Sequence, residues 1–275
     1  MPPTVEILSD LALARRLERA EGTAGARYVE ARARVMPEIG AAWTEIAGAY
    51  VMFDGPDSPI TQTFGLGMFE NPSAADLDRI EQFFRDRKAP THHEVSPMAD
   101  KSLLEILTAR GYQPIELTSI LYLPLADLDI PAGNPEIRVR TTRPEEAELW
   151  ASTAAEGWRE FTAFDGDQML SLMRIIAARD ESPCFLAELN GHPIAAGGLV
   201  IHEGVAVLAG ASTIPEWRKR GAQQALLKAR LEFGAKQGCD LAMIGAEPGS
   251  ISQRNAQRQG FRIAYTRIKW KLASA

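Results

Sequence analysis

Residues 209–229, AGASTIPEWRKRGAQQALLKA, join a strand to a helix through a short basic loop. Apolar residues recur at helical spacing after the loop and predict a helix over residues 221–236. The unpaired backbone N–H groups of a first helical turn, together with the helix dipole, favour an anion such as phosphate. Gly221 lets the backbone approach that anion closely, and the three basic residues before it add positive charge. The stretch therefore predicts a polyanion site where a strand ends.

Strands and helices alternate on both sides of this loop. Asn190-Gly191 lies between two apolar runs and predicts a type I′ hairpin, because both central positions of that turn need positive φ. The full pattern predicts strands over 137–140, 184–189, 194–201, 205–213, 240–246 and 262–272, and helices over 144–156, 167–178, 221–236 and 252–259. We therefore expect an α/β (α+β) fold with a mixed, mostly antiparallel sheet flanked by helices.

The basic loop resembles the phosphate-binding motif of the GNAT superfamily of acyl-CoA-dependent N-acyltransferases. That motif is Gln/Arg-x-x-Gly-x-Gly/Ala before a long helix, and here it reads Arg218-Lys219-Arg220-Gly221-Ala222-Gln223. Gln223 departs from the pattern, because the family has a small residue there. Other matching segments are Thr213-Ile214-Pro215-Glu216, Ser252-Gln253-Arg254-Asn255 and Gln259-Gly260-Phe261, so the resemblance covers residues 136–272.

The resemblance implies a binding site for acetyl-CoA, as co-substrate and without a metal, between the strands at 205–213 and 240–246. The backbone of Thr213 and Ile214 would hold the pantetheine and thioester region. The pyrophosphate would lie on Arg218, Lys219, Arg220, Gly221, Ala222, Gln223 and Gln224. Ser252 and Asn255 would face the CoA arm, with helix capping as the alternative role for both.

Catalysis of acetyl transfer to an amine requires the neutral amine, which is about one part in a thousand near pH 7.4 when the pKa is 10.4. Many family members place a tyrosine, the general acid for the CoA thiolate, at the position of Ala256. Glu247 and Tyr265 are the candidate catalytic residues in its place, and Glu203 is a weaker one. The alternative to a catalytic role is an exposed turn position for Glu247 and a sheet-face position for Tyr265. Because a thiol pKa is about 8.5, the CoA thiolate is an acceptable leaving group near neutral pH, and the reaction can proceed without a general acid.

The first half of the chain repeats part of the pattern, with helices predicted over 74–87 and 101–109 and strands over 91–95 and 115–125. Arg110-Gly111-Tyr112 followed by Thr118-Ser119-Ile120 parallels Gln259-Gly260-Phe261 followed by Thr266-Arg267-Ile268, which indicates a diverged duplication. In the first copy Glu70 would repel phosphate, and no arginine precedes the helix. Three prolines and a glycine within 124–135 mark a boundary near residue 130. We expect two GNAT-like copies in tandem: a degenerate domain over 1–130 without a phosphate loop, and an acyltransferase domain over 131–275.

Charge and composition narrow the classes of function. The 275 residues carry a net charge of −6, divided into −8 for residues 1–130 and +2 for 131–275, which argues against a nucleic-acid partner. Glycines interrupt the apolar stretch 193–212, so we do not expect it to span a membrane. The N-terminus lacks a basic region before an apolar one, so we do not expect a secretory signal. We therefore expect a cytoplasmic protein. The two cysteines, Cys184 and Cys239, suit buried strand positions rather than nucleophiles, and His92-His93 lacks metal-ligand spacing. An oligomer is possible but is not predicted.

The function that these observations favour is an N-acyltransferase that moves an acetyl group from acetyl-CoA to an amine of a small molecule or peptide by direct attack. Trp158, Phe161 and Phe164 lie where the family shapes its acceptor pocket, and packing is their alternative role. The alternative function is a non-catalytic acyl-CoA-binding or sensing protein, favoured by Ala256 and by the degenerate first half.

Overall fold

The computed structural model describes residues 8–126, 128, 130, 133–160 and 165–273. The chain divides into two compact units. Unit 1 consists of Met1–Pro124 and Met243–Ala275, and unit 2 of Leu125–Ala242.

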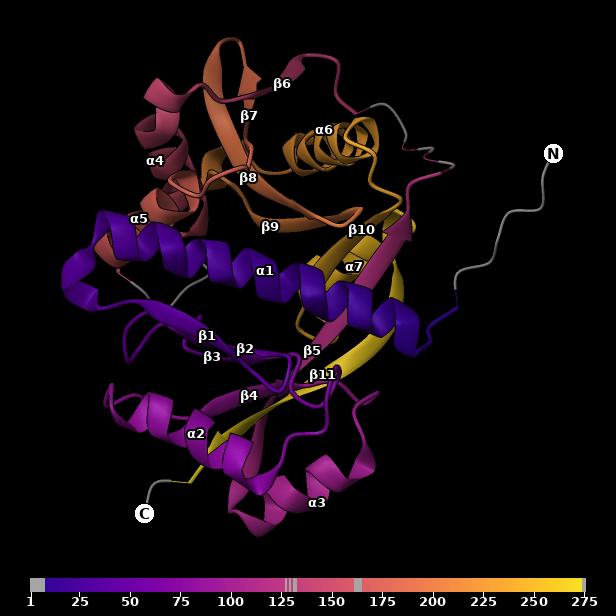
Figure 1. Cartoon of the computed structure of the whole chain (residues 1–275). Coiled ribbons are helices and arrows are strands. Elements are labelled where there is room, and N and C mark those ends of the chain that lie inside the picture. The colour runs from indigo at the N-terminus through magenta and orange to yellow at the C-terminus, as the bar shows by residue number, and fades with distance from the viewer. Residues whose placement is uncertain (1–7, 127, 129, 131–132, 161–164, 274–275) are drawn as a thin grey trace. The chain divides into compact units, whose positions relative to one another are not determined.

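Unit 2 contains an antiparallel run of strands in the order β6-β7-β8-β9. These strands are β6 (Ile137–Thr141), β7 (Cys184–Leu189), β8 (His192–His202) and β9 (Val205–Thr213). The helices α4 (Ala147–Trp158) and α5 (Gly166–Ala177) lie on one face, and α6 (Ala222–Lys236) lies on the other (Figure 1). Asn190 and Gly191 both have positive φ, 51° and 78°, which confirms the predicted hairpin between β7 and β8.

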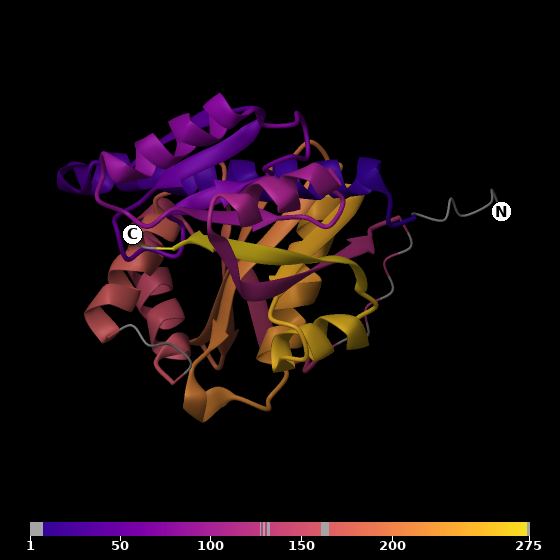
Figure 2. The ribbon, with the colours of Figure 1, turned by 90° about the horizontal axis from the view of Figure 1, so that it is seen from below.

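Unit 1 has the strand order β1-β2-β3-β4-β11-β5-β10. The strands are β1 (Ala42–Ile46), β2 (Ala49–Phe53), β3 (Gln62–Phe64), β4 (His92–Val95), β5 (Tyr112–Pro124), β11 (Arg262–Leu272) and β10 (Leu241–Ala246), whose first two residues belong to unit 2. Helix α1 (Leu11–Val35) covers one face of β1 and β2, whereas α2 (Ala74–Arg85) and α3 (Lys101–Ala109) lie on the opposite side (Figures 1 and 2). The short helix α7 (Ile251–Arg258) precedes β11.

The sequence patterns do not predict α1, although it is the longest helix of the described chain. Asp10 caps its N-terminus by accepting a hydrogen bond from the Leu13 amide at 2.8 Å. Half of its buried residues are alanine or glycine, and added Cβ atoms on Gly22 and Gly25 would clash with Tyr50 and Met52. Helix α1 therefore packs closely against β2.

The final strand of the chain lies inside unit 1, where β11 pairs antiparallel with both β4 and β5. The two strands that carry the repeated motif therefore pair with each other, with Thr118 opposite Arg267 and Ser119 opposite Thr266. The sequence order β3-α2-β4-α3-β5 recurs as β9-α6-β10-α7-β11. The first division between the units, after Pro124, is close to the boundary predicted near residue 130. Because β11 packs with the first copy, however, the units do not coincide with residues 1–130 and 131–275.

The fold class is as predicted: helices flank strands that are mostly antiparallel, and β3 and β4 form a parallel pair. Among the described residues, no helix has both the length and the apolar character that a membrane crossing requires.

Candidate functional site

The basic loop of unit 2 connects the end of β9 to the start of α6. After Thr213 the chain makes a short 3-10 turn, Pro215–Trp217, and then reaches α6 with positive φ at Lys219 (63°) and at Gly221 (94°). Asn134 donates a hydrogen bond from its side-chain amide to the carbonyl of Arg220 at 3.2 Å and so fixes the loop from outside. The left-handed conformation of Gly221 explains why glycine stands there.

The first turn of α6 has no side-chain cap. Gly221 is the N-cap and makes no side-chain cap hydrogen bond, and the first turn of this described helix has no acidic residue. The equivalent helix of the first copy, α2, is different: Ser73 and Asp76 form a reciprocal capping box there. At the first turn of α2 the capping side chains thus fill the place that corresponds to the one where a phosphate could bind at the first turn of α6.

The three basic side chains of the loop have different surroundings. Arg218 turns back toward α4 and donates to the carbonyls of Thr213 (3.3 Å) and Gly157 (3.2 Å) and to the carboxylate of Glu160 (2.5 Å). Lys219 and Arg220 are exposed, and the Arg220 guanidinium lies 5.0 Å from the centre of the Trp217 ring. Arg218 therefore braces the loop in this conformation, and the freely exposed positive charge is that of Lys219 and Arg220.

Gln223, which departs from the family motif, fastens the start of α6 to the end of β9. Its side-chain amide donates to the Thr213 hydroxyl at 2.9 Å. The side chain is thereby directed toward β9, and the backbone of Ala222, Gln223 and Gln224 still forms the first turn of α6.

A β-bulge interrupts β9 just before the loop. Ala196 pairs with Ser212 and Gly198 pairs with Ala209, so that Gly197 alone faces two residues of β9, Gly210 and Ala211. Gly210 adopts positive φ, 64°, which the bulge requires. A bulge leaves the extra residue of the strand unpaired in the ladder.

The two backbone positions predicted to hold pantetheine are Thr213 and Ile214. The Ile214 amide donates to the Ile194 carbonyl of β8 at 3.0 Å and is therefore already used. Since successive residues of a strand direct their backbone groups to opposite edges, those of Thr213 point away from β8. Of the two, Thr213 is the residue whose backbone faces the edge that a strand-like ligand could occupy.

The predicted residues of unit 1 lie around α7 and β11. Ser252, Asn255 and Glu247 are exposed, with Glu247 in the turn after β10. The alternative role of Ser252 as a helix cap is wrong, because Ser250 is the N-cap and accepts from the Gln253 amide at 3.1 Å. Ala256 is buried and supplies no acid.

Tyr265 is buried in a charged cluster that the sequence patterns do not reveal. Its hydroxyl donates to Glu18 of α1 at 2.9 Å, and burial raises its pKa well above the ordinary value, which does not favour a role as an acid. Arg267 lies among the carboxylates of Glu18, Glu21 and Glu94. Burial raises the pKa of Glu18 to about 7. The cluster joins α1 to the sheet, and no local motif predicts it because Glu18 and Glu21 lie more than 200 residues from Tyr265 and Arg267 in the sequence.

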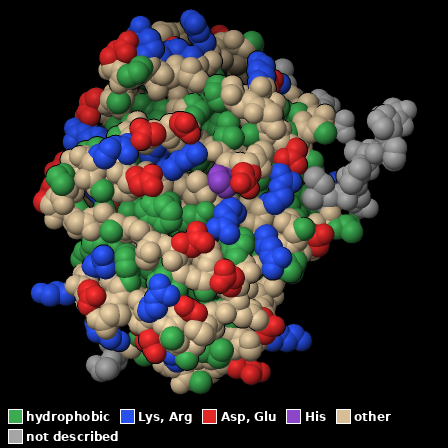
Figure 3. Space-filling view, viewed as in Figure 1, with side chains coloured by type: hydrophobic (Ala, Val, Ile, Leu, Met, Phe, Trp, Pro, Cys, Tyr) green, Lys and Arg blue, Asp and Glu red, His purple; other side chains and the backbone are tan. Residues whose placement is uncertain are grey.

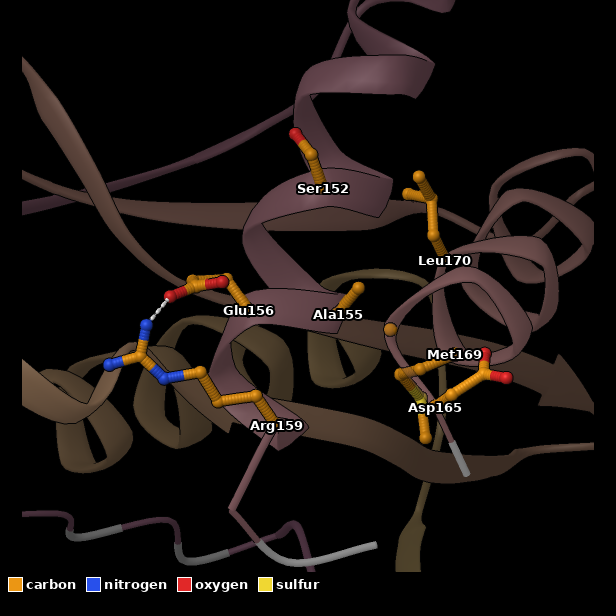
Figure 4. Close-up of a pocket in the computed structure, with 8 residues that line it drawn as sticks. Ser152, Ala155, Glu156, Arg159, Asp165, Met169 and Leu170 are labelled. Carbon is orange, nitrogen blue, oxygen red and sulfur yellow. Dashed lines mark hydrogen bonds and ion pairs between the residues drawn. The ribbon is translucent and has the colours of Figure 1, made fainter. Parts of the chain in front are cut away.

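A pocket of about 260 Å³ lies between α4 and α5 in unit 2 (Figure 4). Glu156 and Arg159 form an ion pair on one side of it, and Met169 lines the other side with the carboxylate of Asp165 nearby (Figure 4). Arg159 also pairs with Glu216 of the basic loop. The pocket is thus connected to the loop through ion pairs, and it combines acidic groups with an apolar wall.

The remaining sequence candidates play no part in this geometry. Cys184 and Cys239 are buried free thiols, and burial raises the pKa of Cys184 to about 11 and raises that of Cys239 as well. His93 is fully buried, which lowers its pKa to about 3. No group of three or more potential metal ligands occurs among the described residues.

Trp158 packs partly buried against the core of unit 2, whereas Phe161 and Phe164 lie outside the described residues. On the face shown in Figure 3, acidic and basic side chains are interspersed.

Comparison with known proteins agrees with this geometry. Residues 150–261, which include β9, the basic loop and α7, match the model of the acetyltransferase (GNAT) family. Residues 150–261 are a GNAT domain. No curated protein sequence matches the chain.

Solved GNAT structures share the fold over most of the chain. A GCN5-related N-acetyltransferase from Kribbella flavida aligns with a TM-score of 0.63 and 17% identity, covering 91% of this chain and 96% of that one. A tandem GNAT protein from the clavulanic acid biosynthesis pathway aligns with a TM-score of 0.60 and 13% identity, covering 82% and 79%. A conserved protein of unknown function from Staphylococcus epidermidis gives 0.61 and 11%, covering 86% and 96%. At these identities the likeness establishes the fold, and the family match indicates acyl transfer from acetyl-CoA to an amine.

Proposed function

We propose that the protein is an acetyl-CoA-dependent N-acetyltransferase that acetylates an amine of a small molecule or peptide. The observation that carries the proposal is the start of α6, which combines an uncapped first turn, Gly221 in a left-handed conformation and two exposed cations at the end of a bulged strand. In this proposal the GNAT domain is the working copy, and the first copy of the tandem binds no acetyl-CoA.

The reaction that this geometry supports is a direct attack. The nitrogen lone pair of the neutral amine adds to the thioester carbonyl, and the negative charge on oxygen is stabilised by backbone N–H groups at the bulge of β9. Collapse of the tetrahedral intermediate breaks the C–S bond and releases CoA as thiolate. The amine proton passes to a base, and the thiolate takes up a proton from the solvent. Glu247, an exposed residue after β10, remains the candidate base that the sequence suggests.

The acceptor pocket in this proposal is the space between α4 and α5. Asp165 gives it acidic oxygens that suit an ammonium group before deprotonation, Glu156 is already paired with Arg159, and Met169 and Leu170 provide apolar surface. The ion pair from Arg159 to Glu216 connects it to the loop. An acceptor that joins a basic amine to an apolar part fits this lining best.

The second candidate function is a sensor that binds acyl-CoA without turnover. Ala256 offers no acid, and the only hydroxyl proposed to replace it, that of Tyr265, is engaged with buried Glu18. A sensor would bind acetyl-CoA and release no thiol.

A panel of amines incubated with acetyl-CoA, with detection of free CoA thiol, separates the two functions. We expect thiol release that depends on both the acceptor and the protein. Saturable acetyl-CoA binding without thiol release across the panel would support the sensor instead.

The binding site itself is tested by the thermal shift that acetyl-CoA produces, since a ligand of the folded state raises the melting temperature. We expect Lys219→Ala with Arg220→Ala to reduce the shift strongly, and Arg138→Ala with Lys236→Ala, which removes two exposed charges elsewhere in unit 2, to leave it intact. Arg218→Met should mainly lower the melting temperature of the free protein. Equal shifts in both double variants would refute the assignment.

A further inference from the structure

Arg230 is a fully buried positive charge inside the GNAT domain. It projects from α6 toward the sheet, donates from Nε to the Leu226 carbonyl at 3.3 Å, and donates from Nη1 to the Gly198 carbonyl of β8 at 3.2 Å. No carboxylate of a described residue forms an ion pair with it. Burial lowers its pKa to about 10, so it remains charged at neutral pH.

The sheet makes room for this guanidinium at the bulge. A Cβ atom added to Gly197 would lie only 3.2 Å from both Cζ and Nη1 of Arg230. Gly197 is the residue of β8 that faces the bulged Gly210 and Ala211 of β9. Arg230 therefore lies directly behind the bulge.

A second arginine approaches the same place from the other face. A Cβ atom on Gly198 would lie 3.2 Å from Nη2 of Arg179, which follows α5 and is 9% exposed. Side chains of successive strand residues point to opposite faces of the sheet. Gly197 therefore leaves space on the face that α6 covers, and Gly198 leaves space on the face that α5 covers. The absence of side chains on these two glycines thus allows the guanidinium groups of Arg230 and Arg179 to lie close to the bulge, one on each face of the sheet.

Burying a charge without a counter-ion is costly, and a hydrophobic residue would pack α6 on the sheet as well. The charge acts over a distance in this dry interior, because Coulomb interactions strengthen as the effective dielectric falls. The proposed reaction develops negative charge on the thioester oxygen at the bulge.

We infer that Arg230 is a positioning residue for acyl transfer, whose fixed charge behind the bulge of β9 polarises the thioester carbonyl and stabilises the oxyanion while its bond to Gly198 fixes the bulge. This inference rests on the proposed function, because it requires a thioester bound at the bulge.

The test compares Arg230→Met, which removes the charge at similar volume, with Arg230→Lys, which keeps it. Arg230→Gln is a second neutral variant in case the methionine variant does not fold. Lys236→Met removes an exposed charge from the same helix and serves as the matched control. Each folded variant is titrated with acetyl-CoA carrying ¹³C at the thioester carbonyl, and the carbonyl stretch of the bound ligand is recorded by difference infrared spectroscopy.

We expect the bound carbonyl of the wild type to absorb at lower frequency than that of free acetyl-CoA. The neutral variants should bind acetyl-CoA but lose much of this shift, whereas Arg230→Lys and Lys236→Met should retain it. With an acceptor identified, the neutral variants should lower kcat by about tenfold or more with little change in KM for acetyl-CoA, as for loss of an oxyanion-stabilising group.

Two failures can be told apart. If acetyl-CoA binds to the wild type and the neutral variants with the same carbonyl frequency, the inference is overturned and the proposed function stands. If the wild type does not bind acetyl-CoA, the proposed function falls and the inference falls with it.

Discussion

Glu18 shows how a single buried residue can govern pH dependence in unit 1. It is completely buried, accepts from Tyr265 and contacts Arg267, yet burial outweighs these partners and raises its pKa from 4.5 to about 7. Between these two values the folded state holds a proton that the unfolded state has lost. By linkage, this carboxyl makes the protein less stable as pH rises through that range.

Glu18→Gln should remove this dependence, because the amide stays neutral and its oxygen can still accept from Tyr265. A shift of this size corresponds to a loss in the wild type on the order of 3 kcal/mol in unfolding free energy between pH 4.5 and pH 8. The stability of the variant relative to the wild type should therefore rise with pH, as measured by urea unfolding at several pH values. The lowered pKa values of His92 and His93 give the opposite slope in both proteins and cancel in the difference. Parallel curves of unfolding free energy against pH for Glu18→Gln and the wild type would contradict the prediction. Glu116→Gln, which removes a carboxylate at an exposed position, is the control.

Two helices at equivalent places in the two copies differ at their first turn. In α2 the capping box of Ser73 and Asp76 satisfies the backbone donors, whereas α6 begins at Gly221 without a cap. Uncapped donors usually cost stability, because Ser, Thr, Asp or Asn at the N-cap stabilises a helix by about 1 kcal/mol. The feature of α6 that is poor for stability is the one that suits a ligand phosphate.

Gly221→Ala should lower both the unfolding free energy and the affinity for acetyl-CoA. An alanine at φ 94° costs about 1–2 kcal/mol, and a relaxed backbone would misdirect the donors of the first turn. Gly238→Ala, at φ 84° beyond the other end of α6 and with open space for the Cβ, is the matched control. Denaturant unfolding should show similar losses in both variants, and calorimetry should show weaker acetyl-CoA binding only in Gly221→Ala. Equal affinities in the two variants would argue against a phosphate at this turn.

At the scale of the whole molecule, the two ends of the chain are tied together within unit 1. β11 lies between β4 and β5, and Trp270 joins the buried core beneath α2 and α3. The first copy is thus completed by a strand that follows the second copy's helices in the sequence. This arrangement explains why the compact units do not follow the order of the sequence.

Residues 1–130 alone should therefore fail to fold, because β4 would lose one neighbouring strand, β5 would lose both, and the core would lack Trp270. Circular dichroism and sedimentation should show a disordered or aggregated fragment. Fusion of residues 260–273 through a flexible linker should restore cooperative unfolding. A folded monomeric fragment without this addition would show that β5 can take the place of β11.

Patterns of neighbouring residues predict the features that depend on local spacing. Asn190-Gly191 predicted its hairpin, the basic loop before Gly221 predicted the start of α6, and the Gly-aromatic motifs predicted a repeat, because each is set by the φ preferences or periodicity of a few neighbouring residues. Other features become visible only in the folded chain. It turned Arg218 toward Glu160, buried Tyr265 on Glu18, placed Arg230 behind the bulge and inserted β11 into the first copy. These contacts join residues far apart in the chain, and their energies come from burial and charge in a packed interior, which no local pattern encodes.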